Sequence, residues 1–202
     1  GNHIWDKKKE ILGLLASQEI PILRPLNYPP GAEGRGDIVL TTPNQKKILL
    51  LHAMGRVFFK ETLDCPFRAI DAALKSYEKE KLDGIVVDFH AEATSEKVAF
   101  GLYLDGKVSA VVGTHSHILT ADNRVLPKGT AYITDLGMAG ARDSVIGVAT
   151  PGPLQQFLTQ QPQKFEIPEH GACTISGVLI EIEERSKLAH SIERVQKEVE
   201  VA

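Results

Sequence analysis

Apolar residues recur along the chain with two different periods, and the change of period separates predicted helices from predicted strands. Residues 64–81 and 94–105 place apolar side chains every three to four positions, the spacing of a helix with one buried face. Short runs rich in aliphatic residues are typical of buried strands and cover residues 47–52, 84–89, 109–112 and 130–134. Helices that alternate with strands in this way indicate a layered α/β fold with a mixed sheet.

The flanking segments extend the same pattern. Further helices are expected over residues 6–18 and 153–161. Residues 21–36 hold four prolines and three glycines, which predicts a long loop. The tail alternates over residues 174–183 and 189–195, and this predicts an antiparallel hairpin. No repeat or low-complexity segment divides the chain, so residues 1–202 are interpreted as a single domain.

Composition narrows the function classes. The chain has 202 residues, 43% of them hydrophobic, and a net charge of −3, which suits one globular domain and gives no basic excess for a general nucleic-acid groove. No apolar stretch reaches the roughly 18 residues of a membrane span, and no signal peptide is visible. Two distant cysteines, Cys65 and Cys173, favour core packing and a reducing, cytoplasmic setting.

The candidate chemistry lies where predicted strands end. His115 and His117 follow the apolar run that ends at Val112, and residues two apart in an extended segment point the same way. His90 ends the preceding strand, and Glu92 follows two residues later. A single histidine in such a place is usually an exposed or hydrogen-bonded residue, but an HxH pair beside a second strand-end histidine favours a metal site. Open α/β sheets bind their ligands at the carboxyl ends of strands.

The residue types indicate which metals and roles to expect. With seven histidines against two cysteines, the site should have nitrogen and oxygen ligands. Asn2 could offer its amide oxygen, and the neighbouring His3 would then point elsewhere and act as a proton donor or as a cation near the substrate. Glu92 is interpreted equally well as a partner of a ligating histidine or as a surface carboxylate. Three further histidines have no partner spacing and are read as structural or exposed: His52, His170 and His190.

Taken in order, these motifs resemble those of the calcineurin-like metallophosphoesterases, and in particular the YmdB-like bacterial phosphodiesterases. The similarity is carried by long stretches that span essentially the whole chain: residues 1–8, 88–97, 111–117, 120–124 and 126–138. Motifs of this length are more specific than a lone HxH.

The resemblance implies a four-layer α/β/β/α sandwich with mixed sheets and two divalent metal ions, iron or manganese first and zinc or magnesium next. It implies hydrolysis of phosphodiesters of the 2′,3′-cyclic nucleotide class through a hydroxide activated by the two metals. Asn2, His90 and His115 match ligands of one metal, and His117 matches a ligand of the other. His3 matches the catalytic histidine near the leaving oxygen.

The motif set of that family includes residues that would precede residue 1 of this sequence. The family places an Asp ligand and a bridging Glu on strands that precede the Gly-Asn-His motif, whereas this sequence starts at that motif without an initiator Met. We therefore expect an N-terminal portion and its strands to be missing. The expected partners are a small phosphodiester or cyclic nucleotide, without a membrane, and a homo-oligomer is left open.

Two other interpretations remain. The first is a catalytically silent fragment or regulatory module that keeps an incomplete site for one metal ion or a phosphate. The second is an amidohydrolase-type barrel, which also uses an HxH pair. In such barrels the pair usually lies on the first strand, and eight βα units do not fit 202 residues.

Overall fold

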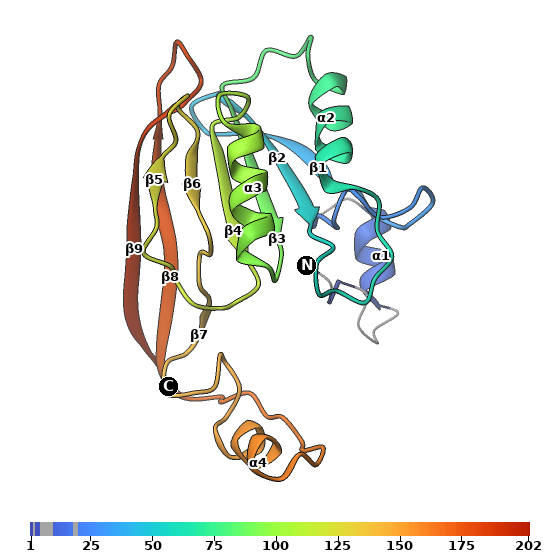
Figure 1. The fold of residues 1–202 in the computed structure, drawn as a ribbon. Coiled ribbons are helices and arrows are strands. Elements are labelled where there is room, and N and C mark those ends of the chain that lie inside the picture. Colours follow the sequence, from blue (N-terminus) through green and yellow to red (C-terminus); the bar gives the residue numbers. More distant parts are fainter. Residues whose placement is uncertain (2, 5–9, 18–19) are drawn as a thin grey trace.

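The computed structural model describes residues 1, 3–4, 10–17 and 20–202 (Figure 1). The helices are α1 (Glu10–Ser17), α2 (Pro66–Ser76), α3 (Thr94–Leu104) and α4 (Pro151–Thr159). The strands are β1 (Asp37–Thr41), β2 (Lys47–Met54), β3 (Gly84–His90), β4 (Ala110–Thr114), β5 (Arg124–Val125), β6 (Ala131–Ile133), β7 (Ala139–Ala141), β8 (Gly171–Ile182) and β9 (Ala189–Val201).

The larger sheet has six strands in the order β1-β2-β3-β4-β6-β5. Strands β2, β3, β4 and β6 run parallel to one another, while β1 and β5 pair antiparallel at its two edges. The sheet is therefore mixed, as the sequence predicts. Because the inner strands are parallel, their carboxyl ends all lie at the same end of the sheet. This is where α/β proteins place their sites.

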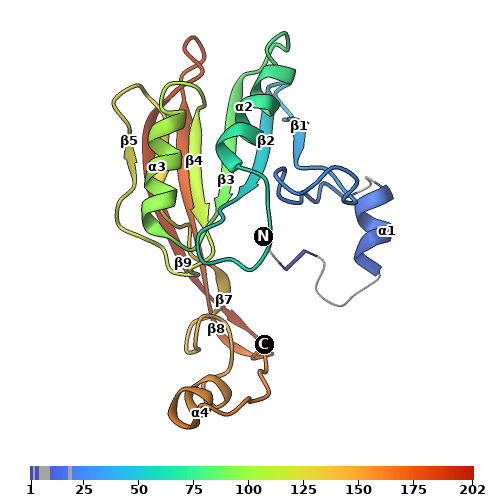
Figure 2. The same ribbon diagram turned by 45° about the vertical axis from the view of Figure 1, so that its right-hand side comes forward.

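The second sheet is antiparallel, with the order β7-β8-β9, and it stacks on one face of the first. Helices α2 and α3 cover the opposite face, as the two ribbon views show (Figures 1 and 2). The described residues thus form three successive layers, helices, mixed sheet and antiparallel sheet. They correspond to three layers of the α/β/β/α sandwich that the family resemblance implies.

Two hydrophobic cores fill the spaces between the layers, and strand alternation assigns residues to them. In β4, Val111 packs in the core beneath the helices with Phe89 and Phe100, whose rings stack with centroids 3.9 Å apart. Its neighbours Ala110 and Val112 belong to the other core, between the two sheets. Both faces of β4 are buried, which explains why the strand reads as a continuous apolar run.

Some elements differ from the sequence prediction. Helix α2 ends at Ser76, five residues before the predicted end at Lys81, and its N-cap is Cys65. Strand β9 runs to Val201, six residues beyond the predicted Val195. Three short strands were not predicted, namely β1, β5 and β7, because none contains an apolar run long enough to stand out.

Helix α4 lies apart from the layers, on a segment that projects beyond the end of the smaller sheet (Figures 1 and 2). Several of its large apolar side chains are exposed, including Phe157 and Leu158. Among the described residues, no helix has the length and apolar character needed to cross a membrane.

Candidate active site

Polar side chains gather where β2, β3 and β4 end. Asp88 and His90 lie two residues apart in β3, so their side chains share the face that Val86 presents to the inter-sheet core. The register pairs Asp88 with His52 of β2 and His90 with Thr114 of β4. Four polar residues from three parallel strands therefore occupy one face at the carboxyl edge.

These residues form a continuous hydrogen-bonded chain. The Thr114 hydroxyl donates to Asp88 Oδ1 at 2.8 Å and lies 3.0 Å from His90 Nδ1. His90 Nε2 lies 3.0 Å from His115 Nδ1, and His115 Nε2 lies 2.8 Å from Glu92 Oε2. Glu92 is thus the partner of a site histidine, one of the two interpretations that the sequence left open.

The contacts of the Thr114 hydroxyl determine which nitrogen of His90 carries the proton. A hydroxyl has a single proton, and Thr114 gives it to Asp88, so Thr114 accepts from His90 Nδ1–H. Nε2 of His90 then carries a lone pair directed at His115. Metal-ligating histidines characteristically donate their other ring N–H to a protein acceptor in this manner.

The opposite end of this contact chain is buried. His52 is 4% exposed, and its Nδ1 lies 2.8 Å from Asp88 Oδ2. Burial opposes ionisation of Asp88, but His52 and the Thr114 hydroxyl outweigh it and lower the pKa of the carboxyl. Asp88 therefore remains an ionised acceptor that orients Thr114. His52, which the sequence reading left as structural or exposed, is a buried structural residue beside the site.

The two facing nitrogens suit a shared metal ion. His90 Nε2 and His115 Nδ1 are 3.0 Å apart, which is about the separation of two ligands bound to one ion at ~2.1 Å and at right angles. Burial, the largest cause, and the neighbouring His115 lower the pKa of His90. A neutral imidazole is the form that binds a metal. The His90 and His115 nitrogens therefore fit the divalent metal ion that the family resemblance implies.

His117 is placed differently from the expectation. Strand β4 ends at Thr114, and the backbone then takes positive φ angles of 121° at His115 and 65° at His117. The segment is not extended, so the argument that both side chains point the same way does not apply. His117 is exposed, and its Nδ1 donates to the carbonyl oxygen of Ile146 at 2.9 Å, which leaves Nε2 with a lone pair.

The N-terminal motif is described only in part. Asn2 lies outside the described residues, so its assignment as a ligand is not tested. Gly1 packs against the site, because a Cβ at this position would lie 2.6 Å from His90 Cε1. His3 is exposed in the turn that follows. Within the described part of the chain, no three His, Cys, Asp or Glu side chains lie close enough to hold an ion together. Of the three predicted ligands that the structure describes, it brings His90 and His115 together.

A buried ion pair holds the histidine loop in place. Asp135, which is 0% exposed, accepts from Lys97 Nζ of α3 and from the Ser116 backbone N–H, both at 2.8 Å. Ser116 lies between the two histidines, whose left-handed backbones each cost about 1–3 kcal/mol. Sequence reasoning missed this pair, although an Asp directly after an apolar strand and a Lys on a helix near the core were its signals.

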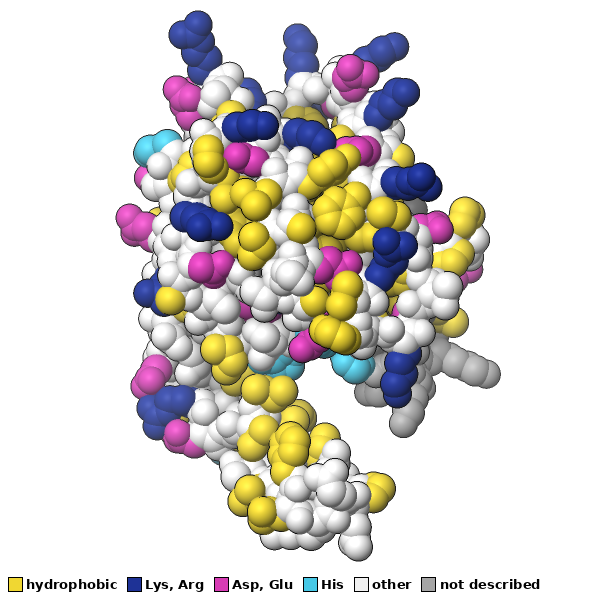
Figure 3. All heavy atoms as spheres, in the orientation of Figure 1, with side chains coloured by type: hydrophobic (Ala, Val, Ile, Leu, Met, Phe, Trp, Pro, Cys, Tyr) yellow, Lys and Arg dark blue, Asp and Glu magenta, His cyan; other side chains and the backbone are white. Residues whose placement is uncertain are grey.

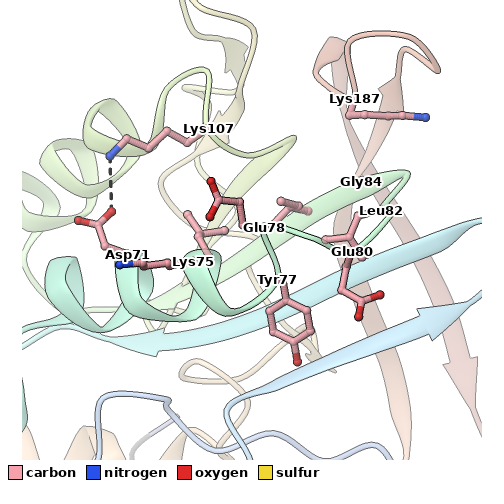
Figure 4. A pocket seen from close by; sticks show the side chains of 11 residues that line it. Asp71, Lys75, Tyr77, Glu78, Glu80, Leu82, Gly84, Lys107 and Lys187 are labelled. Carbon is pink, nitrogen blue, oxygen red and sulfur yellow. Dashed lines mark ion pairs between the residues drawn. The ribbon is translucent and has the colours of Figure 1, made fainter.

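A larger cavity lies at the opposite end of the strands, beside the start of β3 at Gly84 (Figure 4). Its volume is about 580 Å³, and its lining is mixed in charge. Lys107 pairs with Asp71 at 3.5 Å, and Lys187 pairs with Asp83 at 3.2 Å. Because these two lysines are paired with carboxylates and no histidine lines the cavity, we do not regard it as the reaction site.

A smaller cavity of about 490 Å³ adjoins the paired histidines and includes His115 and Glu92 in its lining. The space-filling view shows histidine side chains at the lower edge of the body, where the surface turns inward above the projecting α4 segment (Figure 3). The candidate site is therefore open to a small molecule from this side.

Comparison with known proteins shows the family of this chain. The YmdB-like protein family matches residues 1–195. This chain belongs to that family. A 2′,3′-cyclic-nucleotide 2′-phosphodiesterase of Bacillus subtilis (strain 168) is 46% identical over 196 residues, which cover 96% of this chain and 72% of the relative.

Solved structures support the same fold. A crystal structure of a hypothetical protein from Thermus thermophilus superimposes with a TM-score of 0.84 at 43% identity, covering 98% of this chain and 74% of that one. A phosphatase from Mycoplasma pneumoniae gives a TM-score of 0.85 at 31% identity, covering 100% and 71%. The chain thus has the fold of this family, and the relatives named phosphodiesterase and phosphatase support a hydrolase for the parent protein.

Proposed function

We propose that this chain carries the site of a metal-dependent phosphodiesterase that acts on 2′,3′-cyclic nucleotides. The observation that carries the proposal is the pair of facing nitrogens of His90 and His115, 3.0 Å apart at the carboxyl ends of neighbouring parallel strands. The Bacillus subtilis relative, 46% identical, bears the name of this activity. Residues 1–202 would act as one metallophosphoesterase-like unit.

The proposed ligands are Asn2, His90 and His115 for one ion and His117 for a second, with iron or manganese preferred over zinc or magnesium. When bound, such ions supply Lewis-acid charge and acidify water at neutral pH. The chain's own residues orient this site. Thr114 and Glu92 each hold one ring nitrogen of a ligating histidine, so that the other nitrogen faces the ion.

His3 is the proposed proton donor. It is exposed and lies within two residues of Gly1, which packs on the His90 ring. From there its imidazole would protonate the departing 2′ oxygen of the ribose, which would leave the phosphate on the 3′ oxygen. General-acid assistance of this kind is worth about 10²–10⁴-fold in rate. The substrate is a small molecule, and the two free cysteines, Cys65 and Cys173, favour a reducing compartment such as the cytoplasm.

The second candidate is a module that binds one metal ion or a phosphate without turnover. It is favoured by one observation: within the described residues only His90 and His115 come together as ligands. Under this proposal the protein would hold one ion per chain and would bind nucleoside phosphates without cleaving their cyclic precursors.

Metal content and turnover, measured on the same preparation, separate the two candidates. The purified protein is loaded with Mn²⁺ or Fe²⁺, and metal per chain is compared with hydrolysis of 2′,3′-cyclic AMP. Two ions per chain with release of adenosine 3′-monophosphate support the phosphodiesterase. One ion with binding but no hydrolysis supports the module, and a protein that binds neither metal nor a nucleoside phosphate contradicts both.

A further inference from the structure

The cavity beside the paired histidines has a lining that the proposed chemistry does not use. It is formed by His115 and Glu92 together with four consecutive residues of the loop after β2, Phe58, Phe59, Lys60 and Glu61. Its volume of about 490 Å³ lies in the range of small-molecule sites. Because His115 belongs to both, a phosphoester held at the histidines would have its remaining atoms next to this loop.

The two phenylalanines of the loop have different environments. Phe59 packs on the site, with its ring centroid 5.1 Å from that of His115 in an edge-on arrangement and 6.0 Å from that of His90. Phe58 is 82% exposed. One ring therefore supports the histidines, and the neighbouring residue presents its ring to solvent at the rim of the same cavity.

The exposure of Phe58 does not come from a loosely attached loop. The Glu96 carboxylate of α3 accepts from the backbone N–H groups of Arg56 and Val57, at 3.0 Å and 3.2 Å. Gly55 N–H donates to the His90 carbonyl, and a Cβ at Gly55 would lie 2.4 Å from Glu96 Oε2. The backbone is thus tied to both α3 and β3 immediately before Phe58.

Phe58 also has a φ angle of 68°, a conformation that bulky residues rarely adopt. A single exposed phenylalanine needs no explanation on its own. An exposed ring on an anchored loop, with an unfavourable backbone and at the rim of a cavity that contains a site histidine, is a less ordinary combination. Strained residues of this kind concentrate at ligand-binding sites.

We propose that Phe58 is a stacking platform for the base of the nucleotide, so that the loop 58–61 forms a base subsite beside the phosphate position. This inference rests on the proposed function and names the part of the substrate that the loop recognises. Aromatic side chains stack on every base through its π-face, so the subsite would accept nucleotides as a class without selecting one base. Lys60 and Glu61 complete the lining of the cavity beside the ring.

Equilibrium binding tests the subsite without requiring turnover. Adenosine 3′-monophosphate and inorganic phosphate are titrated into the Mn²⁺-loaded protein and into the variants Phe58→Ala and Phe58→Tyr. We expect Phe58→Ala to weaken nucleotide binding by about 10-fold or more, while phosphate binding changes by less than about 2-fold. Phe58→Tyr keeps the ring and should retain the nucleotide affinity. Phe157→Ala, which removes another exposed ring on α4, is the matched control and should change neither affinity.

Three outcomes of the binding titrations overturn the subsite. In the first, the wild-type protein binds the nucleotide no more tightly than phosphate. In the second, Phe58→Ala weakens the binding of both ligands equally, and in the third it weakens the binding of neither. A loss of the self-association of the protein in Phe58→Ala, with unchanged nucleotide affinity, would assign the ring to a protein partner instead.

The proposed phosphodiesterase is judged separately by comparing 2′,3′-cyclic AMP with glycerol 1,2-cyclic phosphate, which has no base. Equal kcat/KM for the two leaves the activity standing and the subsite refuted, whereas no hydrolysis of either refutes the activity alone.

Discussion

The two ends of the six-stranded sheet both carry cavities and charged or polar side chains, but they differ in how those side chains are partnered. At the amino end, Lys107 pairs with Asp71, as Figure 4 shows, and Lys187 pairs with Asp83, so both of these lysines are partnered by a carboxylate. At the carboxyl end, His90 and His115 each use one ring nitrogen for a protein partner and turn the other toward a shared point. We therefore place the candidate site at the carboxyl end, where two ring nitrogens face each other at 3.0 Å, although the cavity at the amino end is the larger of the two.

The largest effect should come from removing one of the facing nitrogens. We expect His90→Ala to lower Mn²⁺ affinity by more than about 100-fold, since loss of a residue that merely orients a ligand already costs about 10–100-fold. Calorimetric titration with Mn²⁺ and metal analysis of the purified protein measure this. His190→Ala, which removes an exposed histidine on β9, is the control and should bind normally. Normal Mn²⁺ affinity in His90→Ala would show that His90 and His115 do not form the metal site.

His3 should separate catalysis from metal binding. We expect His3→Ala to lower kcat for 2′,3′-cyclic AMP by about 100-fold or more with metal content unchanged, because a proton donor acts on the leaving oxygen and not on the ion. Parallel kinetic assays and metal analysis check both quantities. A variant that loses its metal together with its activity would show His3 to be a ligand.

The hydroxyl of Thr114 should have a smaller effect of the same kind. We expect Thr114→Val to weaken Mn²⁺ binding by about 10-fold, because His90 Nδ1 loses its acceptor and the ring is no longer held in one orientation. Thr114→Ser restores the hydroxyl and should recover most of the affinity. If serine and valine weaken binding to the same degree, the residue matters for packing and does not position the ring.

The smallest effect is expected at the amino end. We expect Asp71→Asn to change kcat/KM by less than about 2-fold and to lower the free energy of unfolding by at most about 1 kcal/mol, since the pair with Lys107 is half exposed. Chemical denaturation and the cyclic nucleotide assay measure the two quantities. A large loss of activity in this variant would show that the amino-end cavity takes part in function.

The sequence predicted those parts of the fold that depend on local pattern. The buried strands β2, β3 and β4 appear as apolar runs because both of their faces are covered, and His90 and His115 were found because each follows such a run. The partners Asp88 and Thr114 were missed. Their contact depends on the register between neighbouring strands, which no local pattern contains.

His117 shows a second limit of local reasoning. The alternation rule holds only while the chain stays extended, and here the strand ends at Thr114, one residue before the histidine pair. The positive φ angles that turn the loop are held in place by Asp135, which binds the Ser116 amide from 19 positions further along the chain. Distant contacts of this sort decide side-chain direction, and spacing alone does not reveal them.

The burial of Lys97 and Asp135 has a consequence for how the histidine loop opens. Loops usually exchange their amide protons through small local fluctuations, far below the free energy of global unfolding. The Ser116 amide donates to a carboxylate that is 0% exposed and that also binds a lysine only 3% exposed. Releasing this amide to solvent uncovers a buried charge pair between α3 and the sheet. The loop that carries the reactive histidines should therefore exchange as slowly as the strands beneath it, and the site should persist until the core itself opens.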